Sequence, residues 1–421
     1  VDYMSRSAFL LQQGRFVADV AYFYGEEAPL TGLFEKKTIG DAPEGHGYDF
    51  VNADVLLNQF KVEDGQLTTQ AGARYRALYL GGSSQRMTLP VLRRLSALVE
   101  AGAVVVGAKP LGSPSLADDQ AEFAALADRL WSGVASGRGR VIAENDINKA
   151  LRTIGVERDF DYAGSAPDSK LMFVHRKLDD GDIYFVTNRT ARAETIKARF
   201  RVTGKRPEIW RAETGKGDPI SYRIENGHTV VPLEMKENDA FFVVFRKPAV
   251  KLAETISKPE YRVIGAIDAP WSVHFEPGRG APDSITLDRL APLNENANGG
   301  IRYFSGTARY SSSFNLPRPA HEGEPLWLDL GKVGDLAEVL VNGRSLGITW
   351  LAPHRVDIAE AVKPGRNSIE VRVTNLWVNR LIGDAQPGAA KIGFTTLPTY
   401  MPDAKLRPSG LMGPVTLLAR K

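Results

Sequence analysis

The strongest constraint on the fold of this chain is an alternation of apolar and polar residues in its last hundred or so positions. Residues 326–346 alternate through two candidate strands that are joined at Asn342-Gly343. An Asn-Gly pair favours the tight turn of an antiparallel hairpin, because both residues tolerate a positive φ. Residues 371–384 and 409–417 continue the pattern. We therefore expect an antiparallel sandwich with one solvent-facing side in this part of the chain.

Length and composition restrict the class of protein. A chain of 421 residues is too long for one hydrophobic core and long enough for three domains. Its 53 basic and 50 acidic residues leave a net charge of +3, which indicates neither nucleic acid nor an anionic membrane as a partner. The sequence contains no run of 18 apolar residues that would predict a membrane span. It also contains no cysteine, which excludes disulfides, cysteine nucleophiles and thiolate metal ligands.

The N-terminal residues predict a helix over residues 3–14 that ends at Gly14. The chain begins with Val1, and no basic segment followed by an apolar core indicates a signal peptide. A chain that opens inside a helix resembles a piece of a longer protein. We therefore expect residues 1–15 to be the remnant of a preceding domain.

The next section alternates short apolar runs with helical stripes. The runs at 17–24, 77–80 and 103–106 are continuously apolar, as expected of parallel strands buried on both faces. Helical patterns at 88–101 and 118–131 are followed by a further strand and helix within residues 141–154. This order predicts a flavodoxin-like doubly wound α/β domain over residues 16–165.

Helical periodicity then disappears. Six short strands, separated by turns rich in Gly and Asn, are expected between residues 171 and 246. They predict a small β-sandwich over residues 166–250. A linker near residues 248–260 leads into the C-terminal domain, residues 251–421. The chain is thus expected to be multidomain, with one α/β domain and two all-β domains.

The α/β domain lacks the usual signals of a cofactor site. Gly25 precedes two glutamates, which would repel a phosphate, and no GxGxxG or Walker loop follows any strand. Residues 81–84 (GGSS) form either a small anion-binding nest or a tight turn, and the turn is favoured. No organic cofactor is expected. The six histidines have no zinc-ligand spacing, and no GxSxG motif is present.

One polar segment of this domain, residues 46–54, is a candidate for contact with a substrate. Asp49, Asn52 and Asp54 lie close together in it, and paired carboxylates perform acid–base catalysis in glycosidases. The alternative is structural: Asn52 or Asp54 caps a helix and Asp49 forms a turn. The structural alternative is favoured, and substrate binding by Asp49 and Asn52 remains the other possibility.

The C-terminal domain offers a second set of candidates. Trp350 and Trp377 can stack on the apolar face of a sugar ring. Asn379, Arg380 and Asp384 provide polar groups that suit sugar hydroxyls. The same three side chains can instead dock their loop, residues 375–384, against a neighbouring domain, and this interpretation is preferred.

The chain as a whole resembles the C-terminal half of family-106 glycoside hydrolases, the α-L-rhamnosidases. The resemblance covers essentially all 421 residues. It is carried by VADVAYFYGEEAPL, YDFVNADVL, RALYLGGSSQRMTLPVLRRLSALVEAGAVVVGAKPLGSPSL, IRYFSGTARYSSSF, VTNLWVNRLIGD and SGLMGPV. The C-terminal segments alone also resemble the jelly-roll, galactose-binding-like domain of family-2 glycosidases.

The resemblance implies hydrolysis of terminal α-L-rhamnose from glycosides or polysaccharides, with inversion. Two carboxyl groups on an N-terminal (β/α)8-type barrel carry out this reaction in the family, and the barrel also holds a calcium ion. No eightfold βα pattern occurs in this chain, so the resemblance assigns no catalytic residue and no metal ligand here. Residues 1–15 are then the end of the barrel, and the chain alone is expected to be inactive.

The expected partners are a rhamnoside substrate and the catalytic barrel of the same protein. A periplasmic or extracellular location is expected, because rhamnosides are met outside the cytoplasm. Two alternatives remain open: a stand-alone carbohydrate-binding or assembly module, and a part of a family-2-like glycosidase.

Overall fold

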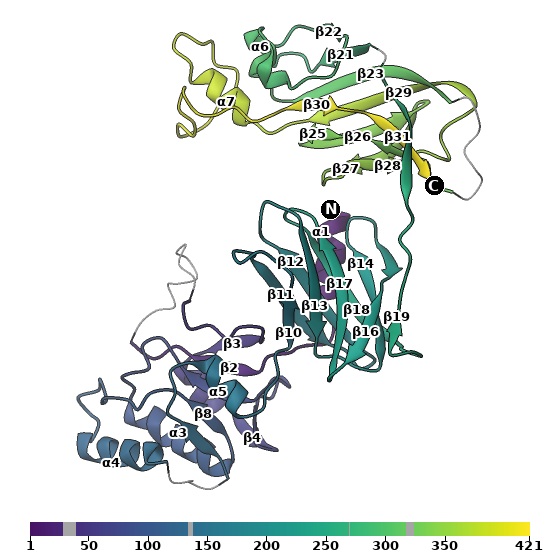
Figure 1. Cartoon of the computed structure of the whole chain (residues 1–421). Coiled ribbons are helices and arrows are strands. Elements are labelled where there is room, and N and C mark those ends of the chain that lie inside the picture. The colour runs from purple at the N-terminus through teal and green to yellow at the C-terminus, as the bar shows by residue number, and fades with distance from the viewer. Residues whose placement is uncertain (28–38, 134–137, 269, 317–323) are drawn as a thin grey trace. The chain divides into compact units, whose positions relative to one another are not determined.

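The computed structural model describes residues 1–27, 39–133, 138–268, 270–316 and 324–421. The chain divides into two compact units, Val1–Ile256 and Ser257–Lys421 (Figure 1). A parallel five-stranded sheet with helices lies in the first unit, and antiparallel sheets occur in both. The expected combination of an α/β part with all-β parts is confirmed. Within the described residues, no helix has the length and apolar character needed to cross a membrane.

The parallel sheet has the strand order β3-β2-β7-β8-β9. Numbered along the chain, the five strands lie in the order 2-1-3-4-5. The runs expected at 77–80 and 103–106 are strands, and the run at 17–24 contains a shorter one. The strands are β2 (Val20–Phe23), β3 (Tyr48–Val51), β7 (Ala77–Leu80), β8 (Val104–Val106) and β9 (Arg140–Ile142).

Helices cover both faces of this sheet. On one face, α2, α3 and α4 bury Leu56, Leu92 and Phe123 against strand residues such as Leu78. On the other face, α5 packs through Leu151 against strand residues. Figure 1 shows α3 and α4 side by side. The helices are α2 (Ala53–Asn58), α3 (Leu89–Ala101), α4 (Gln120–Trp131) and α5 (Ile147–Thr153), and a small antiparallel sheet adds β4 (Lys61–Glu63), β5 (Gln66–Thr68) and β6 (Arg74–Tyr75).

The rest of the first unit is a pair of antiparallel sheets. Their orders are β1-β11-β12-β18-β14-β15 and β10-β13-β17-β16-β19. Tyr184 and Val243 of the first sheet share a core with Ile196 and Leu233 of the second. The strands are β1 (Arg15–Phe16), β10 (Phe160–Ala163), β11 (Leu171–Lys177), β12 (Asp182–Asn188), β13 (Glu194–Phe200), β14 (Lys205–Arg211), β15 (Lys216–Pro219), β16 (Tyr222–Glu225), β17 (His228–Met235), β18 (Ala240–Pro248) and β19 (Ala253–Glu254).

The prediction of six strands between residues 171 and 246 was too low, because β15 and β16 were missed. All four residues of β15 are exposed, so the strand has no apolar period to detect.

The helix expected at 3–14 is α1 (Asp2–Leu11), and it packs on the first sheet through Tyr3, Leu10 and Leu11. Gly14 does not end this helix. It turns the chain into β1 with a φ of +56°, beside the carbonyl group of Lys177.

The second unit contains a six-stranded sheet, β22-β21-β23-β29-β26-β27, and a four-stranded sheet, β20-β31-β24-β28. Val273, Val339 and Val371 of the larger sheet share a core with Leu328 and Leu417 of the smaller one. The strands are β20 (Tyr261–Ala266), β21 (Trp271–Phe275), β22 (Ser284–Leu287), β23 (Thr307–Leu316), β24 (Trp327–Asp329), β26 (Leu336–Val341), β27 (Arg344–Thr349), β28 (Arg355–Asp357), β29 (Gly365–Thr374) and β31 (Thr416–Arg420), with a separate pair β25 (Lys332–Gly334) and β30 (Gly410–Gly413).

The hairpin predicted at Asn342-Gly343 is confirmed. The two residues join β26 to β27 with φ values of +51° and +80°, as a type I′ turn requires.

The segment expected as a loop at 375–384 is instead largely helical, as α7 (Val378–Asp384). The helix was missed because three of its inward-facing residues are polar and no side chain caps its start. Two further short helices are η2 (Leu293–Glu295) and α6 (Gly299–Arg302).

Candidate functional site

The carboxyl edge of the parallel sheet is where doubly wound proteins usually bind ligands, and here the chain's own side chains occupy it. At the start of α3, the Glu26 carboxylate accepts hydrogen bonds from the Thr88 N–H (2.7 Å) and hydroxyl (3.0 Å). The next amide, that of Leu89, donates to Asp118 at 2.7 Å. These carboxylates take the place that an anionic ligand would have at a helix N-terminus.

Two tyrosines fill the neighbouring part of this edge. The hydroxyls of Tyr22 and Tyr79 donate to Asp41 at 2.8 and 3.0 Å, and the Gly82 N–H donates to the Tyr22 hydroxyl at 3.1 Å. Burial, reinforced by Asp41, raises the pKa of both tyrosines, so both remain protonated donors. Because the Ser84 hydroxyl also donates to the Gly81 carbonyl oxygen, residues 81–84 form the expected tight turn.

A buried ionic cluster at the opposite edge of the parallel sheet, where β2 and β3 begin, joins the α/β part to the sandwich of the first unit. Asp19, which is 4% exposed, contacts His46 Nδ1 at 2.8 Å and accepts from Arg201 at 3.0 Å. The Arg201 Nε atom lies 3.7 Å from Asp159, whose side chain is fully buried. One arginine of the sandwich therefore contacts two carboxylates of the preceding segment.

The cluster continues through His175. Its Nδ1 atom lies 2.8 Å from Asp159 and its Nε2 atom 3.0 Å from Asp182. The Tyr184 hydroxyl donates to Asp159 at 2.6 Å, and the Tyr184 ring stacks on His175 with centroids 4.0 Å apart. Lys177 completes the group at 3.0 Å from Asp182. The carboxylates and histidines are buried and paired with one another. The cluster therefore links the α/β part of the first unit to its sandwich.

Burial and charge oppose each other in this cluster. Burial disfavours the charged form of His175, but Asp159 and Asp182 outweigh it and raise the pKa of the imidazole. Burial also disfavours charge on Asp19 and Asp182, yet their cationic partners prevail and the pKa values of both carboxyls are lowered. The charged forms of His175, Asp19 and Asp182 are therefore favoured.

The residues predicted between 46 and 54 have structural partners. Asn52 is the N-cap of α2, and its side-chain oxygen accepts from the Val55 N–H at 2.9 Å, as expected. Asp49 was expected in a turn, which is wrong: it lies in β3 and accepts from the Tyr75 hydroxyl at 2.9 Å. Burial raises the pKa of Asp49, and the Tyr75 hydrogen bond only partly offsets it. Binding of substrate by Asp49 or Asn52 stays a prediction.

The polar residues predicted around α7 lie inside the second unit. Arg380 and Asp384 are 5% and 8% exposed, and the Arg380 Nε atom is 3.0 Å from the Asp384 carboxylate. The contact is an ion pair without hydrogen-bond alignment, since the buried Nε–H meets no acceptor at a suitable angle. Asp384 also accepts from the Ile392 and Gly393 amides at 3.0 and 2.7 Å. The pair therefore anchors the loop that follows α7.

Asn379 has a similar role. Its side-chain amide donates to the Arg407 carbonyl oxygen at 2.8 Å and accepts from the Arg407 N–H at 2.8 Å. The two predicted tryptophans are different, because Trp350 is 39% and Trp377 47% exposed. Trp350 follows β27, whereas Trp377 precedes the first residue of α7 and lies under the Arg279 guanidinium at 5.0 Å. Asn379, Arg380 and Asp384 thus anchor the backbone of the segment that follows α7. The two tryptophans, by contrast, are partly exposed to solvent.

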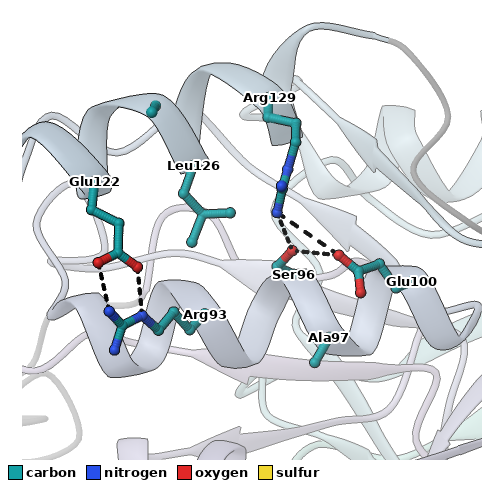
Figure 2. Close-up of a pocket in the computed structure, with 8 residues that line it drawn as sticks. Arg93, Ser96, Ala97, Glu100, Glu122, Leu126 and Arg129 are labelled. Carbon is teal, nitrogen blue, oxygen red and sulfur yellow. Dashed lines mark hydrogen bonds and ion pairs between the residues drawn. The ribbon is translucent and has the colours of Figure 1, made fainter.

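Figure 2 shows a groove between α3 and α4, in which the charged side chains pair with one another. Arg93 makes a two-armed contact with Glu122 at 2.8 and 2.6 Å. Arg129 reaches Ser96 at 3.3 Å and Glu100 at 3.9 Å. These are exposed pairs between two packed helices, and exposed pairs of this kind mainly support helix packing.

A metal site was expected outside this chain, in the catalytic barrel. Among the residues that the structure describes, no group of three or more His, Cys, Asp or Glu side chains is arranged to hold a metal ion.

Comparison with known proteins decides the family. Residues 1–224 match the model of glycoside hydrolase family 106, described as alpha-L-rhamnosidase. The chain belongs to this family. The match runs from α1 through most of β16, so it includes the α/β part and much of the sandwich of the first unit.

The family assignment extends over the whole chain through a solved structure. The rhamnosidase from Novosphingobium sp. PP1Y is 50% identical to this chain, with a TM-score of 0.89. The similarity covers 99% of this chain and 40% of the Novosphingobium chain. A protein of Formosa agariphila, named provisionally as a beta-glucuronidase, is 25% identical over an aligned 612 residues. That alignment covers 91% of this chain and 51% of the relative. This chain therefore spans about half, or less, of the length of each of these two proteins.

The sequence analysis did not find the buried cluster of this rhamnosidase-family chain. The six histidines were judged scattered, yet the fold brings His46 and His175 into one group with Asp19 and Asp159. The only local sign was a charged residue inside an otherwise apolar run, as with Asp19 in residues 17–24. A buried acid in such a run needs a cationic partner, and that partner, Arg201, lies 182 positions away from Asp19.

Proposed function

We propose that this chain is the non-catalytic C-terminal portion of an α-L-rhamnosidase that hydrolyses terminal α-L-rhamnose from glycosides or polysaccharides. The observation that carries the proposal is the 50% identity over 99% of the chain to a rhamnosidase of which the chain covers 40%. The chemistry then takes place on the remainder of the protein. Two carboxyl groups of a barrel there are proposed to invert the anomeric centre, one as general acid and one as general base.

The residues of this chain support a non-catalytic role. Its buried carboxylates Asp159 and Asp384 are engaged with cations or backbone amides inside the fold. The calcium ion that the family resemblance implies is proposed for the barrel, and no step of the reaction is assigned to it here.

The proposed architecture is a flavodoxin-like domain, a small β-sandwich and a jelly-roll, galactose-binding-like domain. The strand order 2-1-3-4-5 supports the first, because it is the flavodoxin-like order. The two packed antiparallel sheets of the second unit support the last.

The test compares the full-length parent protein with this chain on an aryl α-L-rhamnoside. We expect the parent to release rhamnose whose first-formed anomer is inverted, as followed by NMR, and this chain alone to be inactive. Chelation should abolish the parent's activity, and added calcium should restore it. Cleavage by this chain at the parent's rate would overturn the non-catalytic assignment, and an inactive parent would overturn the substrate.

A carbohydrate-binding module without a hydrolytic partner is the second candidate, favoured by the half-exposed Trp350 and Trp377. Titration calorimetry of this chain with rhamnose and rhamnosides tests it, since a module of this kind must bind sugar by itself. A family-2-like glycosidase is tested in the same screen with aryl β-glucuronides beside the rhamnoside.

The proposed location is periplasmic or extracellular, because the substrates are met there. Cell fractionation of the source organism tests this, and recovery of most of the protein with cytosolic markers would contradict it.

A further inference from the structure

One surface of the second unit exposes an unusual number of large apolar side chains. They lie just before α7 and on the segment that follows it, at one end of the unit (Figure 1). Phe394 is 91% and Leu397 74% exposed. We call this surface the α7 patch, and its residues are Leu376, Trp377, Ile392, Phe394, Leu397 and Met401.

The segment that carries the patch is anchored at several points. Asp384 binds the amides at 392 and 393, and the Gln386 side chain donates to the Pro402 carbonyl oxygen at 2.7 Å. Asn379 fixes the backbone at Arg407 from both sides. A Cβ at Gly393 would lie 3.4 Å from the Trp377 ring, so the backbone there packs on this tryptophan. The apolar side chains are thus presented on a fixed surface.

Such a surface needs an occupant, because large apolar side chains that are exposed together on an anchored segment are typical of interaction sites. Four of the six patch residues are aliphatic or Met, which stack poorly on sugars. The polar groups a sugar would need, on Asn379, Arg380 and Asp384, are buried and already bonded. The surface suits an apolar protein face, with cationic Arg279 over Trp377 at its margin.

We propose that the α7 patch binds the portion of the α-L-rhamnosidase that lies outside this sequence. The inference rests on the proposed function, since it takes the rest of that enzyme as the occupant. It is supported by length: this chain covers 40% of the homologous Novosphingobium rhamnosidase, so most of that enzyme lies outside the matched region. The buried Arg380–Asp384 pair then serves the contact indirectly, by holding the loop in place.

Hydrogen exchange measured by mass spectrometry tests the proposal on intact proteins. Peptides covering residues 390–401 should exchange about tenfold or more slowly in the full-length parent than in this chain alone. Peptides covering the β26–β27 turn, far along the sequence from the patch, serve as the internal reference. Equal exchange of the patch peptides in both proteins would overturn the proposal.

A substitution gives a second measurement. Phe394→Asp should leave the thermal unfolding of this chain unchanged, because Phe394 is almost fully exposed, and should restore fast exchange of the patch peptides in the parent. Leu116→Asp, at a fully exposed leucine of the other unit, is the matched control and should change neither. An unchanged exchange pattern in the Phe394→Asp parent would contradict the proposal.

Two other occupants are outcomes of the same experiments. Protection of the patch peptides in this chain by rhamno-oligosaccharides would replace the proposal by a sugar platform. Concentration-dependent self-association of this chain, abolished by Phe394→Asp, would replace it by a contact between copies. Neither readout uses rhamnoside cleavage, so an inactive parent that still protects the patch refutes the proposed function alone.

Discussion

At the scale of single residues, Asp159 shows most clearly how this chain depends on buried charge. It is fully buried and contacts His175, Tyr184 and Arg201. Removing it takes the acceptor from the buried Tyr184 hydroxyl. It also leaves His175 and Arg201 with one carboxylate each instead of two. The attraction lost at short range in a low-dielectric interior then exceeds any gain from removing one charge.

We therefore predict that Asp159→Ala lowers the free energy of unfolding of the first unit by about 3–5 kcal/mol. Urea unfolding, followed by a probe in that unit, measures the change. Glu360→Ala is the control, since Glu360 forms an exposed pair with Arg344 at 3.0 Å and such pairs contribute only about 0–1 kcal/mol. Similar losses of unfolding free energy in both variants would show that the buried cluster stabilises the fold no more than an exposed ion pair does.

The cluster also predicts a pH dependence. The pKa of His175 is raised in the fold, so its stabilising contribution is complete below the unfolded value of about 6.5 and is lost as the pH rises through the folded value. The pKa values of Asp19 and Asp182 are lowered, so their contributions are present above about pH 4 and are lost as the pH falls through the folded values. These groups favour greatest stability between about pH 4 and 6.5.

The direction of this pH dependence can be tested for His175. The difference in unfolding free energy between the wild type and His175→Gln should narrow as the pH rises from 6 towards 9, because only the wild type has this contribution to lose. His274→Gln, at an exposed histidine of the other unit, gives the background. A difference that stays constant or widens over this range would contradict the charged state assigned to His175.

At the scale of elements, short-range rules account for those helix starts that a side chain caps, such as α2 and α4. Asp119 caps α4, with its carboxylate accepting from the Ala121 and Glu122 amides at 2.8 and 3.0 Å. We predict that Asp119→Ala costs about 1 kcal/mol, whereas Asp119→Ser, which keeps a capping oxygen, costs less. Amide exchange across residues 120–131 should rise in the first variant. An Ala variant as stable as the Ser variant would contradict the cap.

The α7 helix depends on burial rather than on a cap. Arg380→Ala should lower stability by about 1–3 kcal/mol, less than the loss of Asp159, because Asp384 keeps its two amide donors. Amides at 392 and 393 should exchange faster, while any sugar affinity of the chain stays unchanged. Arg366→Ala, at an exposed arginine of the same unit, should change stability by less than about 0.5 kcal/mol. Unaltered exchange at residues 392–393 would contradict the anchoring role.

The sequence predicts elements well where the signal is local. Asn342-Gly343 and the Asn52 cap are encoded within three or four residues, and the structure has both. It fails where the signal is absent or tertiary: β15 is wholly exposed, and α7 directs polar residues inward because their partners, such as Arg407, come from distant positions. The same reason hid the buried cluster. Trp350 and Trp377 were singled out by their place at a strand end and in a connecting segment, and their binding of sugar stays a prediction.

At the scale of the whole molecule, the first unit behaves as one body. β1 pairs with β11, and β10 pairs with β13, so strands from either end of the α/β part belong to the sheets of the sandwich. Asp19 and Asp159 bind Arg201 and His175 across the same junction. The division predicted near residue 165 therefore falls between segments that share hydrogen bonds and buried charges.

This organisation predicts which parts of the chain fold alone. Residues 257–421 contain both sheets of the second unit and a single core, so this fragment should fold and unfold cooperatively by itself. Residues 1–165 carry Asp19 and Asp159 without Arg201 and His175, and should be unfolded or several kcal/mol less stable than within residues 1–256. Urea unfolding of the three fragments, with 1–256 as the control, makes the comparison. A stable 1–165 fragment would establish the α/β part as an independent domain and would show that the buried cluster contributes little to its folding.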